Sequence, residues 1–206
     1  MRQLVLALIL CASSAAAQPG YFRVVGVAQN DTLNVRLGPS ASTADIGDLS
    51  PNEVGVEVLG TDPTGRWGRI IWQDAMGWVS MRFLAPDPQP GIAGTSVPQG
   101  LVCGGTEPFW TLRLAQNSAR YTDIVGADYT MPITLARVAS GRPAWPALLA
   151  HAAPPNTTMT TITPALCSDG MSDRDYPYTA TVVINENGQQ QFVEGCCSLP
   201  LGAGNP

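Results

Sequence analysis

Turn-forming residues divide this 206-residue chain into short segments, and that spacing limits the folds open to it. The sequence has 21 glycines and 18 prolines. Between them, apolar and polar residues alternate in runs that recur about every eight to twelve residues, the spacing of strands in barrels and sandwiches. We therefore predict an all-β protein. The expected strands are residues 22–28, 33–36, 54–59, 67–72, 77–79, 109–114, 119–122, 158–164, 178–184 and 190–194.

Residues 143–151 are the exception to this pattern. Trp145, Leu148 and Leu149 fall at the spacing of one helix face. Pro146 and the flanking prolines limit the length that a helix can reach. We expect one short helix in this segment.

Residues 1–17 have the pattern of a secretory signal peptide. Arg2 gives a positive start, residues 4–10 are apolar, and the segment ends in small residues at Ala17. A membrane-spanning helix needs about 20 apolar residues, so this run is too short to act as one. We predict cleavage after Ala17, with lipidation at Cys11 as the alternative. A periplasmic or secreted protein without a membrane span is the expectation.

The rest of the chain is predicted to form two domains. Residues 21–86 and residues 100–198 contain the expected strands. Between them, residues 87–99 are so rich in proline and glycine that we predict a linker, which favours independent domains. Residues 199–206 are expected to form a flexible tail.

The charge of the chain excludes some partners. The formal net charge is -5, and the chain has no lysine. Nucleic acids and anionic membranes bind basic surfaces. We therefore expect no nucleic-acid partner and no binding to an anionic membrane.

Four cysteines remain after the signal peptide, all in the second half of the chain. An even number of cysteines in an exported protein favours two disulfides. Zinc binding is the alternative, but the adjacent pair does not have the usual spacing of zinc ligands. A bond between the two adjacent cysteines is a further alternative. The four residues are Cys103, Cys167, Cys196 and Cys197.

Residues 22–85 carry the motifs of a known domain family. The sequence T-L-N-V-R-L-G-P-S occupies residues 32–40, W-G-R-I begins at Trp67, and G-W-V-S begins at Gly77. In order and spacing this segment resembles the bacterial SH3-like (SH3b) domains, with Phe83 in place of the more usual tyrosine. The resemblance implies a small barrel that binds peptides, often the stem or cross-bridge peptides of peptidoglycan.

Aromatic residues of this domain are the candidates for a peptide groove. We expect a groove near Trp67 and Trp72, with Trp72 as the best contact because it ends a strand beside a turn. Structural roles are favoured over ligand contact, with Trp78 in the core and Trp67 partly exposed. For Arg36 a salt bridge to a loop carboxylate is favoured over ligand contact. The candidate ligand-binding residues are Trp67, Trp72, Tyr21 and Arg36.

The second domain carries three further motifs. They are C-G-G-T-E-P-F-W at residues 103–110, C-S-D-G-M-S-D at residues 167–173 and G-C-C at residues 195–197. Together they resemble small bacterial envelope domains grouped with META-type and lysozyme-inhibitor-like barrels. The resemblance implies a disulfide-bonded barrel or sandwich in which Cys167 pairs with Cys196 and Cys103 with Cys197. Trp110 is expected to plug the floor of the barrel.

Several acidic residues of the second domain allow two interpretations. Glu107 is a candidate acid or ligand contact, but capping of backbone N–H groups or an ion pair with arginine is favoured. Asp169, Asp173 and Asp175 are candidate calcium ligands, but their spacing differs from the EF-hand pattern. A turn-forming loop is therefore favoured there.

The residues needed for common catalytic sites are missing from the sequence. His151 is the only histidine, no G-x-S-x-G motif is present, and the cysteines are expected to be oxidised. A pair of carboxylates acting on a sugar stays open, since such residues can converge from anywhere. We expect no enzyme, no metal and no cofactor.

The sequence therefore predicts a non-catalytic envelope protein that binds peptidoglycan or a peptide, with an envelope protein as a further candidate partner. The alternative is an inhibitor or stress protein whose second domain blocks a lytic enzyme. Residues 168–178 are the candidate inhibitory loop, through Asp173, Arg174 and Asp175. A purely structural module is the third possibility.

Overall fold

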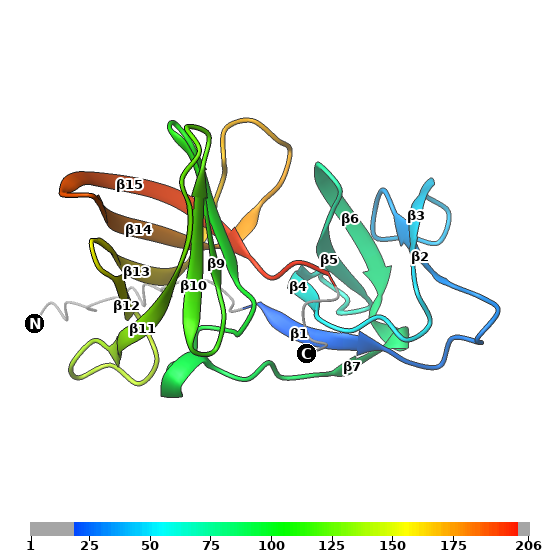
Figure 1. The fold of residues 1–206 in the computed structure, drawn as a ribbon. Helices are drawn as coiled ribbons and strands as arrows, with labels where there is room; N and C mark the ends of the chain where they lie inside the picture. Colours follow the sequence, from blue (N-terminus) through cyan, green and yellow to red (C-terminus); the bar gives the residue numbers. More distant parts are fainter. Residues whose placement is uncertain (1–18, 202–206) are drawn as a thin grey trace, which may run out of the picture.

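The computed structural model describes residues 19–201 (Figure 1). The predicted signal peptide, Cys11 and residues 202–206 lie outside this range. The described residues form fifteen strands and two short 3-10 turns, with no α-helix among them. The prediction of an all-β protein is therefore confirmed.

The N-terminal sheet domain consists of seven strands around their own apolar core. Val35, Ile70 and Val79 alternate with more exposed neighbours and are almost fully buried, and Val56 is fully buried in the same core. The sheet order is β3-β2-β6-β5-β4-β1-β7. Its elements are β1 (Gly20–Val24), β2 (Leu33–Arg36), β3 (Asp45–Leu49), β4 (Val56–Thr61), β5 (Trp67–Trp72), β6 (Ala75–Ser80), η1 (Met81–Phe83) and β7 (Leu84–Pro86).

The C-terminal barrel consists of eight strands that follow one another around a closed ring. Each strand pairs with the next in the chain, and β15 pairs with β8 to close the barrel. Of the two architectures expected for this domain, the structure has the barrel. The strands are β8 (Val102–Thr106), β9 (Phe109–Leu114), β10 (Ser118–Asp123), β11 (Asp128–Val138), β12 (Ala147–Ala153), β13 (Asn156–Cys167), β14 (Tyr176–Glu186) and β15 (Gln189–Ser198).

The predicted helix at residues 143–151 is wrong, because this segment leads into β12. Ala147, Leu149 and His151 are buried, whereas Leu148 and Ala150 are only partly buried. This two-residue period places alternate side chains inside the barrel. The apolar spacing that indicated a helix therefore belongs to a strand with an alanine-rich outer face.

The segment between the domains is packed against the barrel. Ile92 and Val97 belong to the barrel core and are fully buried, and the Ile92 N–H donates to the Val97 carbonyl over 2.8 Å. The turn η2 (Ile92–Gly94) lies between them. A side chain at Gly91 would collide with the Thr95 carbonyl, so this fold-back needs glycine. Residues 87–99 thus do not form a free tether.

Two disulfides hold the barrel. Cys103 is joined to Cys197, its direct cross-strand partner, and Cys167 is joined to Cys196. This is the pairing that the resemblance implied, and it is neither a zinc site nor a bond between the adjacent cysteines. Disulfides are typical of proteins that fold in an oxidising compartment. Within residues 19–201, no helix has the length and apolar character that a membrane span requires.

Candidate functional site

A groove opens on the outer face of the N-terminal sheet domain beside Trp67. Its volume is about 650 Å³. In β5 the buried residues Gly68 and Ile70 face the core, so Trp67 points to the outer face. Ser80 is the cross-strand partner of Trp67 and also lines the groove. The lining is completed by Pro39, Ser40, Ala41, Gly65, Arg66, Met81 and Arg82.

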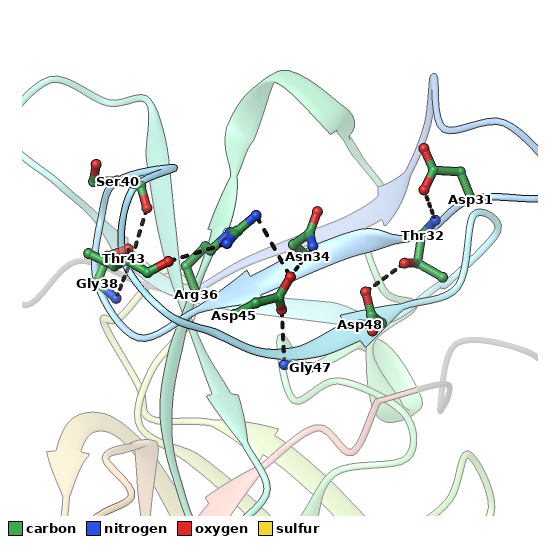
Figure 2. A network of polar contacts seen from close by, with 10 residues as sticks. All are labelled: Asp31, Thr32, Asn34, Arg36, Gly38, Ser40, Thr43, Asp45, Gly47 and Asp48. Atoms are coloured by element: carbon green, nitrogen blue, oxygen red, sulfur yellow. Dashed lines mark hydrogen bonds and ion pairs between the residues drawn. The ribbon is translucent and has the colours of Figure 1, made fainter.

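One wall of the groove is the β2–β3 loop, which Thr43 holds in shape (Figure 2). The Thr43 hydroxyl lies 2.8 Å from the carbonyl oxygen of Ser40 and 3.0 Å from that of Gly38. The backbone N–H of Gly38 donates to the same hydroxyl over 3.2 Å. The loop is therefore ordered before any ligand arrives, which lowers the entropic cost of binding.

The β4–β5 turn also lines the groove, through Gly65 and Arg66, and Asp62 holds this turn in shape. Its carboxylate accepts the backbone N–H of Trp67 over 2.8 Å and that of Thr64 over 3.1 Å. Hydrogen bonds to the charged form, above all from the Thr64 hydroxyl, hold the pKa of Asp62 below its usual value. The turn thus fixes the backbone of Trp67 and places Arg66 at the rim.

The groove carries positive charge in a protein of negative net charge. Arg66 and Arg82 line it, and no acidic residue does. The Arg66 Nε donates to the Thr64 hydroxyl over 3.1 Å, and the Arg82 guanidinium lies 5.3 Å from the centre of the Phe83 ring. Across residues 19–201 neither arginine forms an ion pair, so both are available to a ligand.

Trp72 lies on the other face of the sheet from Trp67. The regular pairing of β5 with β6 puts Trp72 on the same face as Ile70. Its indole N–H donates to the carbonyl of Ile46 over 3.1 Å, and its ring covers Gly47, where a side chain would collide with it. Trp72 therefore supports β3, and the structure does not bring it together with Trp67.

Arg36 and Trp78 lie near each other on the outer face, where β2 pairs with β6. Arg36 donates to the Thr43 carbonyl over 3.2 Å and lies 3.7 Å from the Asp45 carboxylate (Figure 2). It thus makes the carboxylate contact that we had considered, and it supports the groove loop. The expected place of Trp78 in the core is wrong, because Gly77 and Val79 take the inward positions of β6 and Trp78 faces outward.

Tyr21 lies at the seam between the two domains, away from the Trp67 groove. Its hydroxyl is 2.6 Å from that of Tyr178 on β14, so the two form a hydrogen bond across the seam. Burial, together with the nearby Glu57 carboxyl, raises the pKa of Tyr21 above its usual value. Tyr21 is thus part of the domain interface.

The loop between β13 and β14 also holds the domains together. Asp175 forms an ion pair with Arg69 of β5, and Arg174 donates to the Gln73 carbonyl and, over 2.6 Å, to the Asp74 carboxylate. Sequence reasoning missed these contacts, since no local pattern links residues about a hundred positions apart. The candidate inhibitory loop is therefore engaged in contacts with the N-terminal sheet domain of the same molecule.

Asp169 gives this loop its shape. Its carboxylate accepts the backbone N–H groups of Met171 and Ser172 over 3.0 and 2.9 Å and the Tyr176 hydroxyl over 2.9 Å. Although burial opposes it, these hydrogen bonds lower the pKa of Asp169 to about 2. Asp169 therefore acts as the turn-forming residue favoured from the sequence.

The other barrel residues that the sequence singled out lie at separate places in the barrel. Trp110 is buried and lies against Gly105 and Gly195, where any side chain would collide with its indole ring. Glu107 is exposed in the β8–β9 turn, and none of residues 19–201 caps or pairs with it. His151 is buried in the barrel wall with its Nδ1 3.3 Å from the Thr158 hydroxyl.

Comparison with known proteins gives no relative. The chain matches no family model, no curated protein and no solved structure.

Proposed function

We propose that this chain is an exported, non-catalytic binding protein of the cell envelope, and that its N-terminal sheet domain binds acidic peptides of peptidoglycan in the Trp67 groove. The observation that carries the proposal is the groove lining of one indole and two arginines without an acidic residue. The resemblance of residues 22–85 to the SH3-like family supports the same ligand class. Periplasmic location is part of the proposal.

The chemistry of the groove suits such a ligand. An indole face offers apolar area to an extended chain at low entropic cost. Arginine forms paired hydrogen bonds with a carboxylate, and stem peptides carry several carboxylates. Arg66 lies beside Trp67, and Arg82 approaches from η1. A peptide lying over the indole would therefore place its carboxylates between two cations.

The inhibitor hypothesis receives less support. An inhibitory loop must enter the cleft of another protein, but Asp173, Arg174 and Asp175 all contact the N-terminal sheet domain. The backbone N–H of Asp173 donates to the Asp74 carbonyl over 3.1 Å, and that of Asp175 approaches the Met76 sulfur at 3.3 Å. Freeing the loop would break these contacts together with the Arg69–Asp175 ion pair.

Co-sedimentation with insoluble peptidoglycan tests the proposal. We would use the chain from Gln18 onward, the form that the predicted cleavage leaves, at low salt because the binding is electrostatic in part. The unsubstituted protein should pellet with the polymer. Trp67→Ala and the double variant Arg66→Gln/Arg82→Gln should each raise the apparent dissociation constant at least about tenfold, a loss of about 1.4 kcal/mol.

A matched arginine substitution outside the groove provides the control. Arg142 is exposed in the β11–β12 turn, far along the chain from the groove, and Arg142→Gln leaves both groove cations in place. This control should bind like the unsubstituted protein. Unchanged pelleting of Trp67→Ala, with a native circular dichroism spectrum, would show that the groove is not the binding site.

A further inference from the structure

A second and larger cleft lies between the two domains. Its volume is about 720 Å³, within the range of ligand sites. Its floor is the outer face of β8, β9 and β10. The N-terminal sheet domain contributes Glu57, Ile70 and Ile71 to one side, and the β13–β14 loop and the chain end at Leu199–Leu201 contribute the others. In Figure 1 these elements meet between the barrel and the sheet.

The floor of the cleft has a central row of small side chains. Cys196, Gly104, Thr111 and Thr122 are successive cross-strand neighbours from β15 to β10, and all four line the cleft. Side chains on one face of a strand are separated by two residues, so apart from the Cys167–Cys196 disulfide at its β15 end the larger groups stand on either side of this row. The row therefore forms the bottom of a channel.

The two sides of this channel differ in chemistry. On one side lie Phe109, which is 45% exposed, and Ile124, which is 71% exposed. On the other side lies Arg113, exposed on the same face of β9. Phe109 and Arg113 are four residues apart on one strand, which separates them by about 13 Å at roughly 3.3 Å per residue.

Arg113 is the one charged side chain lining the cleft that forms neither a hydrogen bond nor an ion pair within residues 19–201. Asp123 accepts the backbone N–H groups of Val125 and Ala127 over 3.0 and 2.8 Å, and Asp169 is engaged within its own loop. Glu57 accepts the Leu199 N–H over 3.1 Å, and its burial raises its pKa to about 8, so that it is mostly neutral at pH 7. Arg174 is bound to Asp74. Within residues 19–201, Arg113 forms no ion pair.

We propose that the interdomain cleft binds a short extended peptide that ends in a free carboxylate, with the carboxylate at Arg113 and an apolar side chain at Phe109 and Ile124. An extended chain advances about 3.3–3.6 Å per residue, so the span between these two groups corresponds to about four residues. The peptide crosses the central row at Thr111, the small residue between Phe109 and Arg113 on the same face of β9, which leaves room for the peptide backbone. This proposal does not depend on the function of the Trp67 groove.

The test uses N-acetyl-Phe-Ala-Ala-Ala with a free C-terminus and the same peptide with a C-terminal amide. Binding to the chain from Gln18 onward is followed by the backbone amide signals of β8, β9 and β10 in two-dimensional NMR. The free acid should bind at least about tenfold more tightly than the amide. No shift at millimolar peptide, or equal affinity for both peptides, would overturn the proposal.

Two variants locate the site, each with a matched control. Thr111→Trp fills the central row and should abolish binding, whereas Thr181→Trp, on the outer face of β14, should not change it. Arg113→Gln should remove the preference for the free acid, and Arg142→Gln should retain it. Binding that survives Thr111→Trp in a natively folded protein would place the peptide elsewhere.

The same variants separate this site from the Trp67 groove. Trp67→Ala should leave tetrapeptide binding unchanged, and Thr111→Trp should leave peptidoglycan binding unchanged. Loss of tetrapeptide binding in Trp67→Ala would mean that the peptide occupies the groove, and the cleft proposal would then fail.

Discussion

The hydroxyl groups of Tyr21 and Tyr178 lie 2.6 Å apart and join the first strand of the N-terminal sheet domain to the barrel. Glu57 is the cross-strand neighbour of Tyr21, and its carboxyl oxygen accepts the backbone N–H of Leu199, just after β15. Val56 and Val58 face the domain's own core, so Glu57 between them faces the barrel. The seam between the domains is thus a buried polar cluster.

Removing the tyrosine pair should weaken the protein through the seam. Tyr21→Phe and Tyr178→Phe each delete one hydroxyl and leave the other buried without its partner, which costs about 1–2 kcal/mol. The double variant should cost less than the sum, with a coupling energy of about 1 kcal/mol. Urea denaturation of the four proteins measures this coupling, and strictly additive losses would contradict the hydrogen bond.

Glu57 should make stability fall as pH rises. Burial raises its pKa from 4.5 to about 8, so the folded protein holds this proton to higher pH than the unfolded chain does. The contribution of this proton to stability is complete below pH 4.5 and is lost as the pH rises through about 8, by at most about 5 kcal/mol at about 1.4 kcal/mol per pKa unit. In Glu57→Gln the free energy of unfolding should change less between pH 5 and 8 than it does in the unsubstituted protein. An identical pH profile in both proteins would count against the buried acid.

His151 should resist protonation. Burial lowers its pKa to about 4 from 6.5, so its contribution to stability is complete above pH 6.5 and is lost as the pH falls through 4. Because this is the only histidine, its ring protons give one assignable NMR signal. The signal should not shift between pH 8 and 5. A titration midpoint near 6.5 would mean that the ring reaches water.

The two disulfides should differ in their contribution. Cys103–Cys197 spans 94 residues and Cys167–Cys196 spans 29. The chain-entropy relation gives about 4.7 kcal/mol for the longer loop and about 3.6 kcal/mol for the shorter one. Replacing each pair by alanine and measuring denaturation tests this order. A larger loss from the Cys167–Cys196 replacement would contradict it.

Local patterns were sufficient for most of the strands. The expected bounds of β2, β5 and β9 match the structure, because in each a regular alternation has one buried face. The expected strands omitted β3, β7 and β12, and also β8, where Gly104 and Gly105 obscure the pattern, and β11, which contains Pro132. Proline and glycine weaken a strand pattern even where the barrel accepts them.

The errors at the candidate site have a common cause, which is the assignment of alternate side chains to the inner or the outer face of the sheet. Trp67 and Trp72 are five residues apart in an unbroken strand and must face opposite sides. Trp78 faces outward because Val79 is its buried neighbour. The parity of these positions was readable from the sequence. The interdomain cleft was not, since it depends on the long-range docking of Arg174 and Asp175.

The central claim is that a peptidoglycan peptide lies on Trp67, and the indole N–H signals of the chain test it most directly. We would titrate a soluble stem tetrapeptide into the chain from Gln18 onward and follow all tryptophan side chains by NMR. We expect the Trp67 indole signal to shift. The signal of Trp72, whose indole N–H donates to the Ile46 carbonyl, should not shift. A shift of Trp72 without Trp67, or no shift of either, would contradict it.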